Sequence, residues 1–254
     1  AVERVIREMR EHPEEPMSLE NMAATALLSP YHFNRIFSEV TGVSPNRFLA
    51  ALRFEAAKRL LLTTERSVTD ICFEVGYNSL GTFTSHFTEA VGVPPRALRR
   101  VQKEHIMASI RELAEETDAG RVPAGPTLEG WVSPIGRNDG PVFVGIFTTS
   151  VPQGRPARCT VLEGAGPYRL GDLSDGTYHA FAAAFPWSRD PLAYLLPRHS
   201  DVYVGTARSP IVVTEGTVQG RGDIKLRSLL PTDPPMLVAL PVLIAQHSQG
   251  IEAA

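Results

Sequence analysis

A segment of this sequence repeats at a constant offset of 50 residues. Two phenylalanines, a glutamate, a glycine, a valine and a proline recur in register, as Phe33, Phe37, Glu39, Gly42, Val43 and Pro45 and as Phe83, Phe87, Glu89, Gly92, Val93 and Pro95. Phenylalanines at positions i and i+4 share one face of a helix. The glycine ends that helix, and the proline prevents it from resuming. The repeat therefore predicts two short helices of one design, each with a buried face.

Helical periodicity and helix-start signals continue to about Ala119. Serines precede the apolar-periodic runs, as N-cap residues do, at Ser18, Ser29, Ser44, Ser67 and Ser79. Pro30 and Pro45 directly follow two of these serines, at the first helical position. We expect helices at Val2–Glu11, Leu19–Ala26, Pro30–Thr41, Pro45–Leu62, Val68–Val75, Leu80–Val91 and Pro95–Glu116, with a break allowed in the last.

A shorter helix and a tight turn precede each Phe-bearing helix. The second turn is one residue longer, and Gly76 and Asn78 tolerate left-handed backbone there. Two helices joined in this way form a helix-turn-helix, whose second helix fits the DNA major groove, about 12 Å wide. The helix Pro45–Leu62 would rise about 27 Å, which suits two reading helices placed near one DNA turn apart, about 34 Å. The alternative is a plain helical bundle, against which the duplication argues.

Four ordered stretches carry a resemblance to a known family, namely Ser29–Phe37, Thr41–Pro45, Arg53–Leu61 and Gly92–Pro95. Together they resemble the AraC/XylS family of transcription regulators. The resemblance implies a double helix-turn-helix domain over residues 1–103 that binds double-stranded DNA in tandem major grooves at promoters, usually as an activator. RNA polymerase, a small-molecule effector and a second copy of the chain stay open as further partners.

The resemblance also implies which side chains meet DNA. Base contacts are expected from Tyr31, Asn34, Arg35, Leu80, Gly81 and Ser85. Phosphate contacts are expected from His32, Ser38, Thr82, Thr88, Arg96, Arg99 and Arg100. The inward faces are expected to consist of Phe33, Ile36 and Phe37 in the first helix and of Phe83, His86 and Phe87 in the second.

The two expected reading helices differ in chemistry. Arginine can fork onto guanine and asparagine onto adenine, each worth about 1–3 kcal/mol of discrimination. For Arg35 the alternatives are a phosphate contact or a surface ion pair. The second reading helix lacks long polar side chains. We therefore expect the first helix-turn-helix to discriminate between DNA sequences and the second to bind through phosphates and DNA shape.

Charge is distributed unevenly between the two halves of the chain. Up to Lys103 there are 13 basic and 12 acidic residues, giving +1, while the rest has 12 and 16, giving −4, for a net charge of −3. The N-terminal balance is mild for a DNA-binding domain, so an electropositive face must come from local clustering, as at Arg96, Arg99, Arg100 and Lys103.

The bulk sequence indicates an ordinary cytoplasmic protein. The length suits two domains, each with its own core. We see no signal peptide and no apolar run long enough to span a bilayer. The two cysteines, Cys72 and Cys159, have no disulfide or metal spacing, which favours a reducing compartment.

Composition shifts at Gly120, where the Gly- and Pro-rich stretch 120–126 is typical of a linker. Short β-rich runs follow at Pro141–Thr149, Pro156–Leu162, Tyr178–Phe185, Val202–Thr206, Ile211–Val218 and Asp223–Leu229. The segment Gly166–Phe181, with a turn at Asp175–Gly176, resembles the carboxypeptidase-regulatory-like, or transthyretin-like, β-sandwich, over about Leu128–Leu229. Arg189–His199 would be an insertion, and the apolar run Asp233–Leu243 would dock on a sheet or on another subunit.

These patterns predict a two-domain protein, all-α and then an all-β sandwich. Residues 104–126 would be a helix and linker, and residues 127–254 would sense a ligand or dimerise. Because the DNA-binding module comes first, as in Rob-like regulators, a gyrase-inhibitor-type ligand-binding domain is the alternative for the second half. Trp131, Trp187, Tyr178 and Tyr194 are expected in its core rather than around a ligand pocket.

Enzymatic activity is not expected. DNA-alkylation repair proteins can carry the same helical module, but they need an activated cysteine, usually framed as Pro-Cys-His. Cys72 is on an inward helical face, and Cys159 lies between Arg158 and Thr160. Scattered residues such as Asp175, His179, His199 and Asp201 do not predict a metal site, and no cofactor is expected. An adaptor protein that reuses the helical module is the remaining alternative.

Overall fold

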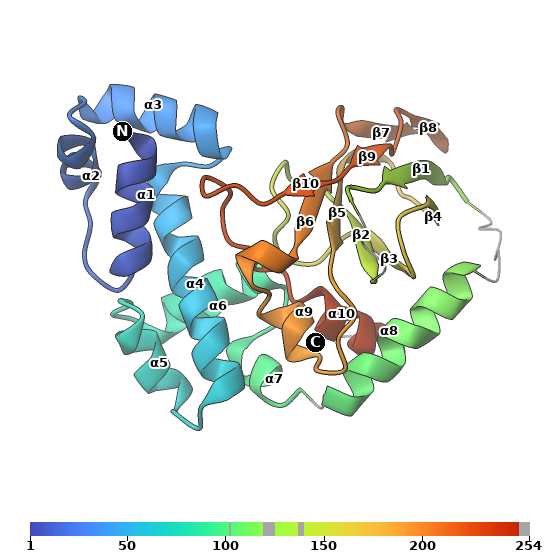
Figure 1. The fold of residues 1–254 in the computed structure, drawn as a ribbon, viewed down its shortest axis with the longest axis horizontal. Helices are drawn as coiled ribbons and strands as arrows, with labels where there is room; N and C mark the ends of the chain where they lie inside the picture. Colours follow the sequence, from blue (N-terminus) through green and yellow to red (C-terminus); the bar gives the residue numbers. More distant parts are fainter. Residues whose placement is uncertain (102, 119–124, 137–139, 249–254) are drawn as a thin grey trace. The chain divides into compact units, whose positions relative to one another are not determined.

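The computed structural model describes residues 1–101, 103–118, 125–136 and 140–248, and the chain forms two compact units (Figure 1). The first, here the helical unit, consists of Ala1–Arg100 together with Leu230–Val238. The second, here the β-rich unit, consists of Val101–Leu229 and Ala239–Ala254. A late segment of the sequence is thus part of the first unit.

The helical unit contains the expected elements in the expected order. They are α1 (Val2–Glu11), α2 (Leu19–Ala26), α3 (Pro30–Thr41), α4 (Pro45–Thr63), α5 (Val68–Glu74), α6 (Leu80–Val91) and α7 (Pro95–Arg99). The ends of α4 and α5 differ by one residue from the prediction. The last expected helix is broken after Arg99 and resumes as α8 (Lys103–Asp118), which is in the β-rich unit.

Side-chain caps set where the paired helices begin. Ser18, Ser29, Ser67 and Ser79 each accept a hydrogen bond from the backbone N–H three residues later. Ser44 stands at the N-cap position of α4, as expected, but its side chain makes no such bond. Pro30 occupies the same position after Ser29, which does cap α3, so the proline does not account for this difference.

The turns within the two helix pairs use different residues. In the first pair Leu27 takes the left-handed conformation, with φ 59°, and exposes 82% of its surface. In the second pair Gly76 takes it, with φ +83°. Asn78, which would also tolerate this conformation, does not adopt it. Both pairs end at a left-handed glycine, Gly42 and Gly92, as expected.

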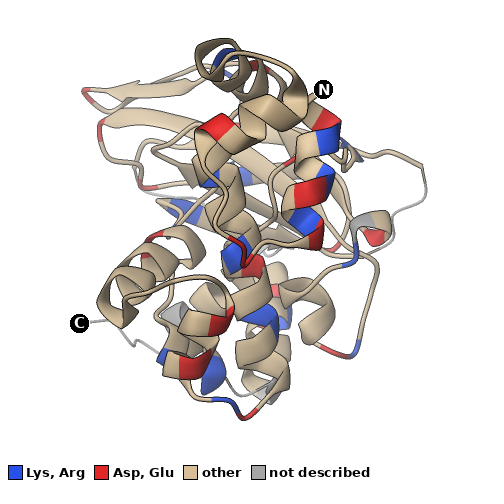
Figure 2. Ribbon diagram, turned by 90° about the vertical axis from the view of Figure 1, so that its left-hand side faces the viewer, with Lys and Arg blue, Asp and Glu red and all other residues tan. Residues whose placement is uncertain are grey.

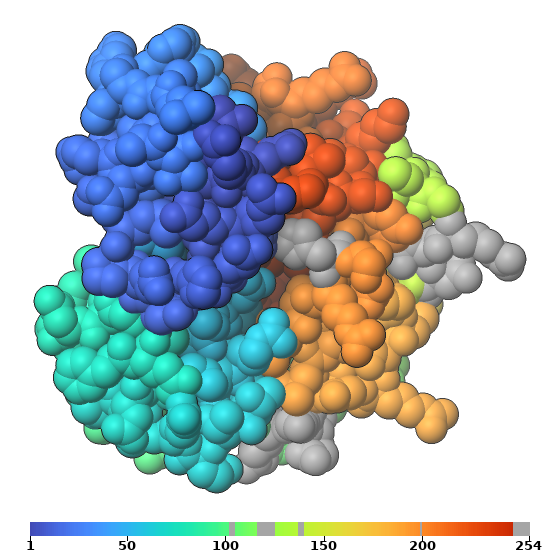
Figure 3. All heavy atoms as spheres, turned by 60° about the vertical axis from the view of Figure 1, so that its left-hand side comes forward, coloured from blue at the N-terminus to red at the C-terminus, as the bar shows by residue number. Residues whose placement is uncertain are grey.

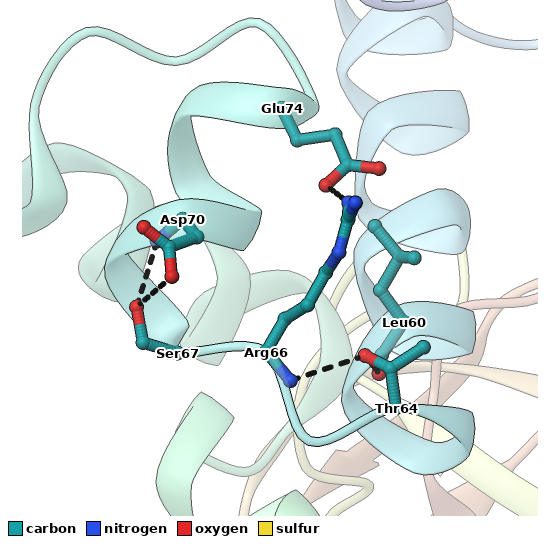
Figure 4. Close-up of polar contacts among 6 residues, drawn as sticks. All are labelled: Leu60, Thr64, Arg66, Ser67, Asp70 and Glu74. Carbon is teal, nitrogen blue, oxygen red and sulfur yellow. Dashed lines mark hydrogen bonds and ion pairs between the residues drawn. The ribbon is translucent and has the colours of Figure 1, made fainter.

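Short-range polar contacts organise the connection between α4 and α5 (Figure 4). Thr64 Oγ1 donates to the Leu60 carbonyl at 2.7 Å, which closes the end of α4. Ser67 Oγ accepts from the Asp70 backbone N–H at 3.0 Å, and Arg66 pairs with Glu74 across α5. The second helix pair therefore starts from a fixed point on α4.

Arg53 on α4 holds the loop that follows α1. Its Nε donates to the Pro13 carbonyl at 2.7 Å and its Nη2 to the Glu15 carbonyl at 2.9 Å. The guanidinium also lies over the Tyr77 ring, 6.0 Å from the centroid, and burial raises the pKa of Tyr77. Arg53 thereby connects the loop that precedes the first helix pair with the turn of the second.

The described part of the β-rich unit contains two sheets. One has the order β4-β1-β9, from Pro167–Leu170, Leu128–Ser133 and Ile224–Lys225. The other has the order β10-β6-β5-β2-β3, with β7 paired to β5 and β8 to β7. Its strands are β2 (Val142–Phe147), β3 (Arg158–Leu162), β5 (Gly176–Ala184), β6 (Tyr203–Thr206), β7 (Ile211–Thr214), β8 (Thr217–Gln219) and β10 (Arg227–Ser228).

One apolar core is shared by both sheets. Every residue of β2 is buried, and the register aligns Val142 with Ala184 and Val144 with Ala182. Leu128 and Tyr168 from the smaller sheet belong to the same cluster. This unit is β-rich but not all-β, which corrects the prediction, because it also contains α8, α9 (Leu192–Leu195), a 3₁₀ turn (His199–Asp201) and α10 (Leu240–Ser248).

Several details of the strand prediction are wrong. The predicted turn at Asp175–Gly176 does not join two paired strands, because β4 pairs with β1 whereas β5 pairs with β2, β6 and β7. The Asp175 carboxylate instead accepts from the backbone N–H groups of Glu215 and Gly216, in the turn that divides the predicted strand Ile211–Val218. Most of the expected linker at 120–126 lies outside the described residues.

The aromatic prediction for this unit is right for only two residues. Tyr178 and Tyr194 are buried, whereas Trp131 and Trp187 are 51% and 56% exposed. Strand β1, which carries Trp131, was not expected, since its central Gly130 weakens the strand signal. Gly130 is required because a Cβ there would lie 2.5 Å from the Gly222 carbonyl oxygen.

Candidate nucleic-acid interface

The repeated phenylalanines anchor the inner face of α3. Phe33 and Phe37 are fully buried, with ring centroids 5.4 Å apart, and Phe37 meets Phe48 of α4 edge-on at 5.5 Å. Edge-to-face contacts of this kind stabilise beyond simple burial. Because this face is fixed, the opposite face of α3 is presented to solvent.

Most of the predicted contact residues on α3 lie on that solvent face. Tyr31 is 83% exposed, His32, Asn34 and Arg35 are exposed, and Ser38 is half-buried. The structure thus brings these side chains together at the surface of one helix. The arrangement offers a ring, an amide and a guanidinium to one ligand surface, which suits the edges of bases.

Arg35 is paired within its own helix. Its Nη1 lies 2.8 Å from Oε1 of Glu39, one turn along α3, and both side chains are more than half exposed. Exposed pairs of this kind contribute about 0.3–0.5 kcal/mol, so a phosphate or a base could replace Glu39 as the partner. Glu39 recurs as Glu89 in the repeat, but there the residue one turn earlier is Ser85.

The inner face of α6 has the same design and a denser aromatic cluster. Phe83 and Phe87 are fully buried, and Phe54 of α4 contacts both rings, at centroid distances of 6.3 Å and 5.8 Å. Tyr77, in the turn before α6, stacks on Phe54 at 5.5 Å. The same helix α4 therefore supports both Phe-bearing helices.

The outer face of α6 carries small polar groups. Gly81, Thr82 and Ser85 are exposed, and Leu80 is half-buried. Thr88 is half-buried, and its hydroxyl donates to the Thr84 carbonyl at 2.7 Å, so its proton is already committed to the helix. This face can approach a backbone closely, but it has few groups that reach outward.

His86 is exposed, which corrects the expectation that it turns inward. The expectation came from aligning His86 with Ile36, which is itself only half-buried. Position along the helix was the available signal, since residue i+3 from a buried phenylalanine lies at the edge of the inner face. Among the described residues Gly81–Thr88, His86 is the only exposed long polar side chain. Alignment of the two copies alone did not reveal its exposure.

The predicted basic cluster is only partly at the surface. Arg96 and Arg100 are exposed, whereas Nε and Nη2 of Arg99 are buried and have no hydrogen-bond partner among the described residues. The Lys103 side chain lies outside the described part of the chain. Along α1, acidic and basic residues alternate rather than separating onto different faces (Figure 2). Long-range electrostatic attraction to DNA should accordingly be modest.

Other kinds of site find little support in the described part of the chain. No group of three or more His, Cys, Asp or Glu side chains gathers there in a metal-binding arrangement. Cys72 is fully buried, and burial raises the pKa of its thiol. Burial raises the pKa of the Cys159 thiol to about 11, against the opposing effect of Arg158. Among the described helices, none is long and apolar enough to cross a membrane.

We expect Cys159 to react slowly with alkylating reagents. With its pKa raised from 9.0 to about 11, its thiolate population at pH 8 falls about a hundredfold relative to an ordinary thiol. Iodoacetamide labelling of the folded chain followed by mass spectrometry measures this, with urea-unfolded protein as the control. Labelling of native Cys159 at the unfolded rate would contradict the burial of its sulfur.

Comparison with known proteins agrees with the geometry of the helical unit. A family model described as "Helix-turn-helix domain" matches residues 22–101, which extend from α2 beyond α7. The helical unit is therefore a helix-turn-helix module. More specifically, the N-terminal region of this chain is an AraC-type helix-turn-helix DNA-binding domain.

The similar curated proteins include transcriptional regulators. The uncharacterized HTH-type transcriptional regulator YobQ of Bacillus subtilis is 33% identical over 88 residues, 35% of this chain and 36% of that protein. The right origin-binding protein of Escherichia coli is 34% identical over 89 residues, 35% of this chain and 31% of that protein. The bifunctional transcriptional activator/DNA repair enzyme AdaA of Bacillus subtilis is 30% identical over 89 residues, 35% and 42% respectively.

A solved structure matches a similar share of the chain. The DNA-binding domain of AdpA, crystallised in complex with a target DNA, is 33% identical, and the match covers 39% of this chain and 88% of that one, with a TM-score of 0.38. The chain spans about a third of the length of the curated relatives named above. The similarity is thus to a domain, and the β-rich unit lies mostly outside it.

Proposed function

We propose that this chain is a sequence-specific transcriptional regulator whose helices α3 and α6 enter successive major grooves at a promoter. The observation that carries the proposal is the repeated helix pair. Both copies bury the same two phenylalanines against α4 and leave the opposite face open to solvent. At about 1.5 Å per residue α4 is about 28 Å long, close to the turn of DNA, about 34 Å, that would separate two reading helices.

Within this proposal, α3 is the main reader of sequence. Arg35 and Asn34 carry the side-chain groups that pair with guanine and adenine, and Tyr31 is exposed at the start of the same helix. The small residues Gly81 and Ser85 let α6 approach the duplex, where Leu80 would meet a thymine methyl. The phosphate contacts would come from His32, Ser38, Thr82, Arg96 and Arg100. Thr88 and Arg99 would join them only if the Thr88 hydroxyl leaves the Thr84 carbonyl and the Arg99 guanidinium turns outward.

The remaining parts of the proposal concern the rest of the chain. We assign DNA binding to residues 1–103, and ligand sensing or dimerisation to the domain over 127–254, with a cytoplasmic location. RNA polymerase, a small-molecule effector and a second copy of the chain are the partners that such a regulator would use. The transthyretin-like sandwich stays our proposal for the β-rich unit, and an enzymatic role is not proposed.

Footprinting tests the proposal directly. Duplexes that bind the full chain are first selected from random sequences, and bound complexes are then probed by hydroxyl radicals. We expect two protected patches on one side of the duplex, about 10 base pairs apart, and nanomolar-range affinity at moderate salt. An adaptor protein would no longer bind DNA detectably at that salt concentration. Protection of a single groove, or of none, would contradict the proposal.

Arg35→Ala is expected to relax sequence selectivity at one base pair, by about 1–3 kcal/mol. Ser85→Ala should change selectivity little, because a short hydroxyl makes at most one replaceable contact. Arg96→Ala should weaken binding to all duplexes alike. It should also reduce the slope of the logarithm of the binding constant against the logarithm of salt concentration by about one unit. Selection from random duplexes, repeated with each variant, measures all three effects.

Glu39→Ala is the matched control for the Arg35 prediction. It breaks the same ion pair but leaves the guanidinium in place, so the selected sequence should be unchanged. If Arg35 only stabilised α3 through Glu39, then Glu39→Ala and Arg35→Ala would have equal effects. Equal loss of selectivity in Arg35→Ala and Ser85→Ala would refute the division of labour between α3 and α6.

A further inference from the structure

The segment Leu230–Val238, here the strap, is part of the helical unit although it follows the strands of the β-rich unit. It connects β10 to α10, so the chain leaves the β-rich unit at Leu229 and returns to it at Ala239. The apolar run Asp233–Leu243, which overlaps the strap, was expected to dock on a sheet or on another subunit. Instead its first part packs on the helices, and only its second part, from Leu240, forms α10.

One end of the strap is held by a buried lysine of α4. Lys58 is 2% exposed, and its Nζ donates to the carbonyl oxygens of Met236 at 3.2 Å and Leu237 at 3.0 Å. Pro235 and Leu237 are buried beside it. Burial lowers the pKa of Lys58 to about 8, and Glu55 opposes this effect. A buried ammonium is costly without partners, so Lys58 depends on the strap for its hydrogen bonds.

The other end of the strap is held by α1. Nη2 of Arg10 donates to the carbonyl oxygens of Pro231 and Asp233, both at 3.2 Å. The strap forms a closed turn at this point, because the Leu230 N–H donates to the Asp233 carboxylate at 2.7 Å and the Asp233 N–H donates to the Leu230 carbonyl at 3.0 Å. Arg10 belongs to α1, which has the dark blue of the chain's first residues in Figure 3.

Arg10 also connects the strap to the aromatic core beneath α3. Its guanidinium lies 5.7 Å from the centroid of Phe48, the ring that packs against Phe37. Glu55 lies near both Arg10 and Lys58 and favours the charged form of each. The strap thus joins α1, α4 and the support of α3 into one hydrogen-bonded assembly.

The strap leaves the outward faces of α3 and α6 open. With the strap in place Tyr31 is 83% exposed, and Arg35 and Ser85 are exposed as well. A segment that blocked DNA would cover these residues. The strap instead is hydrogen-bonded to Lys58 of α4, the helix against which both Phe-bearing helices pack. A shift of the strap would therefore change the packing of both helices.

We propose that the strap is a coupling element through which the β-rich unit sets the spacing of the two recognition helices, and that the docked strap is the DNA-binding state. The inference rests on the proposed function, since it needs α3 and α6 to read two grooves. Both ends of the strap continue directly into elements of the β-rich unit, so a ligand or partner that rearranged β10 or α10 would move it. DNA binding must by linkage act on the strap in return.

The variant Lys58→Met tests the coupling in the full chain. It fills the same space without donating to Met236 or Leu237, and therefore weakens strap docking selectively. Arg59→Met is the matched control, because it removes the same charge from the adjacent, exposed position of α4. Affinity is measured for duplexes with both half-sites at the selected spacing and for duplexes with that spacing changed by two base pairs.

We expect Lys58→Met to lose about fivefold or more of the preference for the selected spacing, whereas Arg59→Met keeps the wild-type preference. Hydrogen exchange of the wild-type chain provides a second readout that needs no substitution. Saturating selected duplex should slow exchange of the strap amides and leave the β7–β8 hairpin, Ile211–Gln219, unchanged.

The outcomes separate this inference from the proposed function. If the wild-type chain binds two grooves but Lys58→Met keeps its spacing preference, or if DNA leaves strap exchange unchanged, the coupling is refuted and the proposed function survives. If the wild-type chain binds no duplex, both fail. Should Lys58→Met prove unfolded by circular dichroism, the exchange experiment on the wild-type chain decides alone.

Discussion

Alanine in place of Phe87 is expected to lower the free energy of unfolding of the helical unit by about 3–5 kcal/mol. Phe87 is fully buried and meets Phe54 of α4 edge-on at 5.8 Å and Phe83 at 5.5 Å. Removing the ring loses its burial and leaves a cavity between α4 and α6 that three remaining rings cannot fill. Urea titration followed by circular dichroism measures the change.

Phe73→Ala is the matched control for this prediction. Phe73 lies on the neighbouring helix α5 and is 55% exposed, so its loss should change stability by less than about 0.5 kcal/mol. Phe87→Ala should also weaken DNA binding by α6, since the cluster sets the direction of that helix. Equal stabilities of the two variants would contradict the buried cluster.

Gly76→Ala is expected to destabilise the helical unit by about 2–5 kcal/mol, because a left-handed backbone costs an L-residue about 1–2 and overpacking about 1–3. Gly76 has φ +83°, and a Cβ there would lie 2.4 Å from the Glu14 carbonyl oxygen. The close atoms belong to the Glu14 backbone, in the loop that Arg53 holds, so the backbone itself would have to shift. Thermal and urea unfolding measure the loss.

Gly42→Ala separates the two causes. Gly42 has φ +76°, but a Cβ there would meet nothing within 4 Å, so only the backbone cost of about 1–2 kcal/mol applies. Gly76→Ala should therefore be the more damaging substitution. If the two variants lose equal stability, the close approach of Glu14 to the second turn is not part of the folded state in solution.

Local signals explain why the helices of the first unit could be predicted. Serine caps, prolines at the first helical position and terminal glycines act within a few residues, as at Ser29, Pro30 and Gly42. The inner faces followed from the spacing of phenylalanines. The alignment of the copies was less reliable at face edges, where His86 is exposed although its counterpart Ile36 is half-buried.

The strands were harder to predict because their partners are distant in the sequence. β1 pairs with β4 and with β9, almost a hundred residues away, and its Gly130 makes sense only beside Gly222. Asp175 looked like a hairpin residue, but its carboxylate caps a turn at Glu215–Gly216. Pairings of this kind depend on shape at a site that no local window contains.

The sequence by itself determined the repeated helix pair, its caps, its buried phenylalanines and its resemblance to a family of DNA-binding regulators, because those features are set by contacts within one or two helical turns. Only the tertiary structure decided the place of the strap and the burial of Lys58 beneath it. Nothing in the sequence indicates that a lysine in a helix will contact an apolar run 178 residues later. They become partners because folding removes both from water, and each then needs the hydrogen bonds of the other.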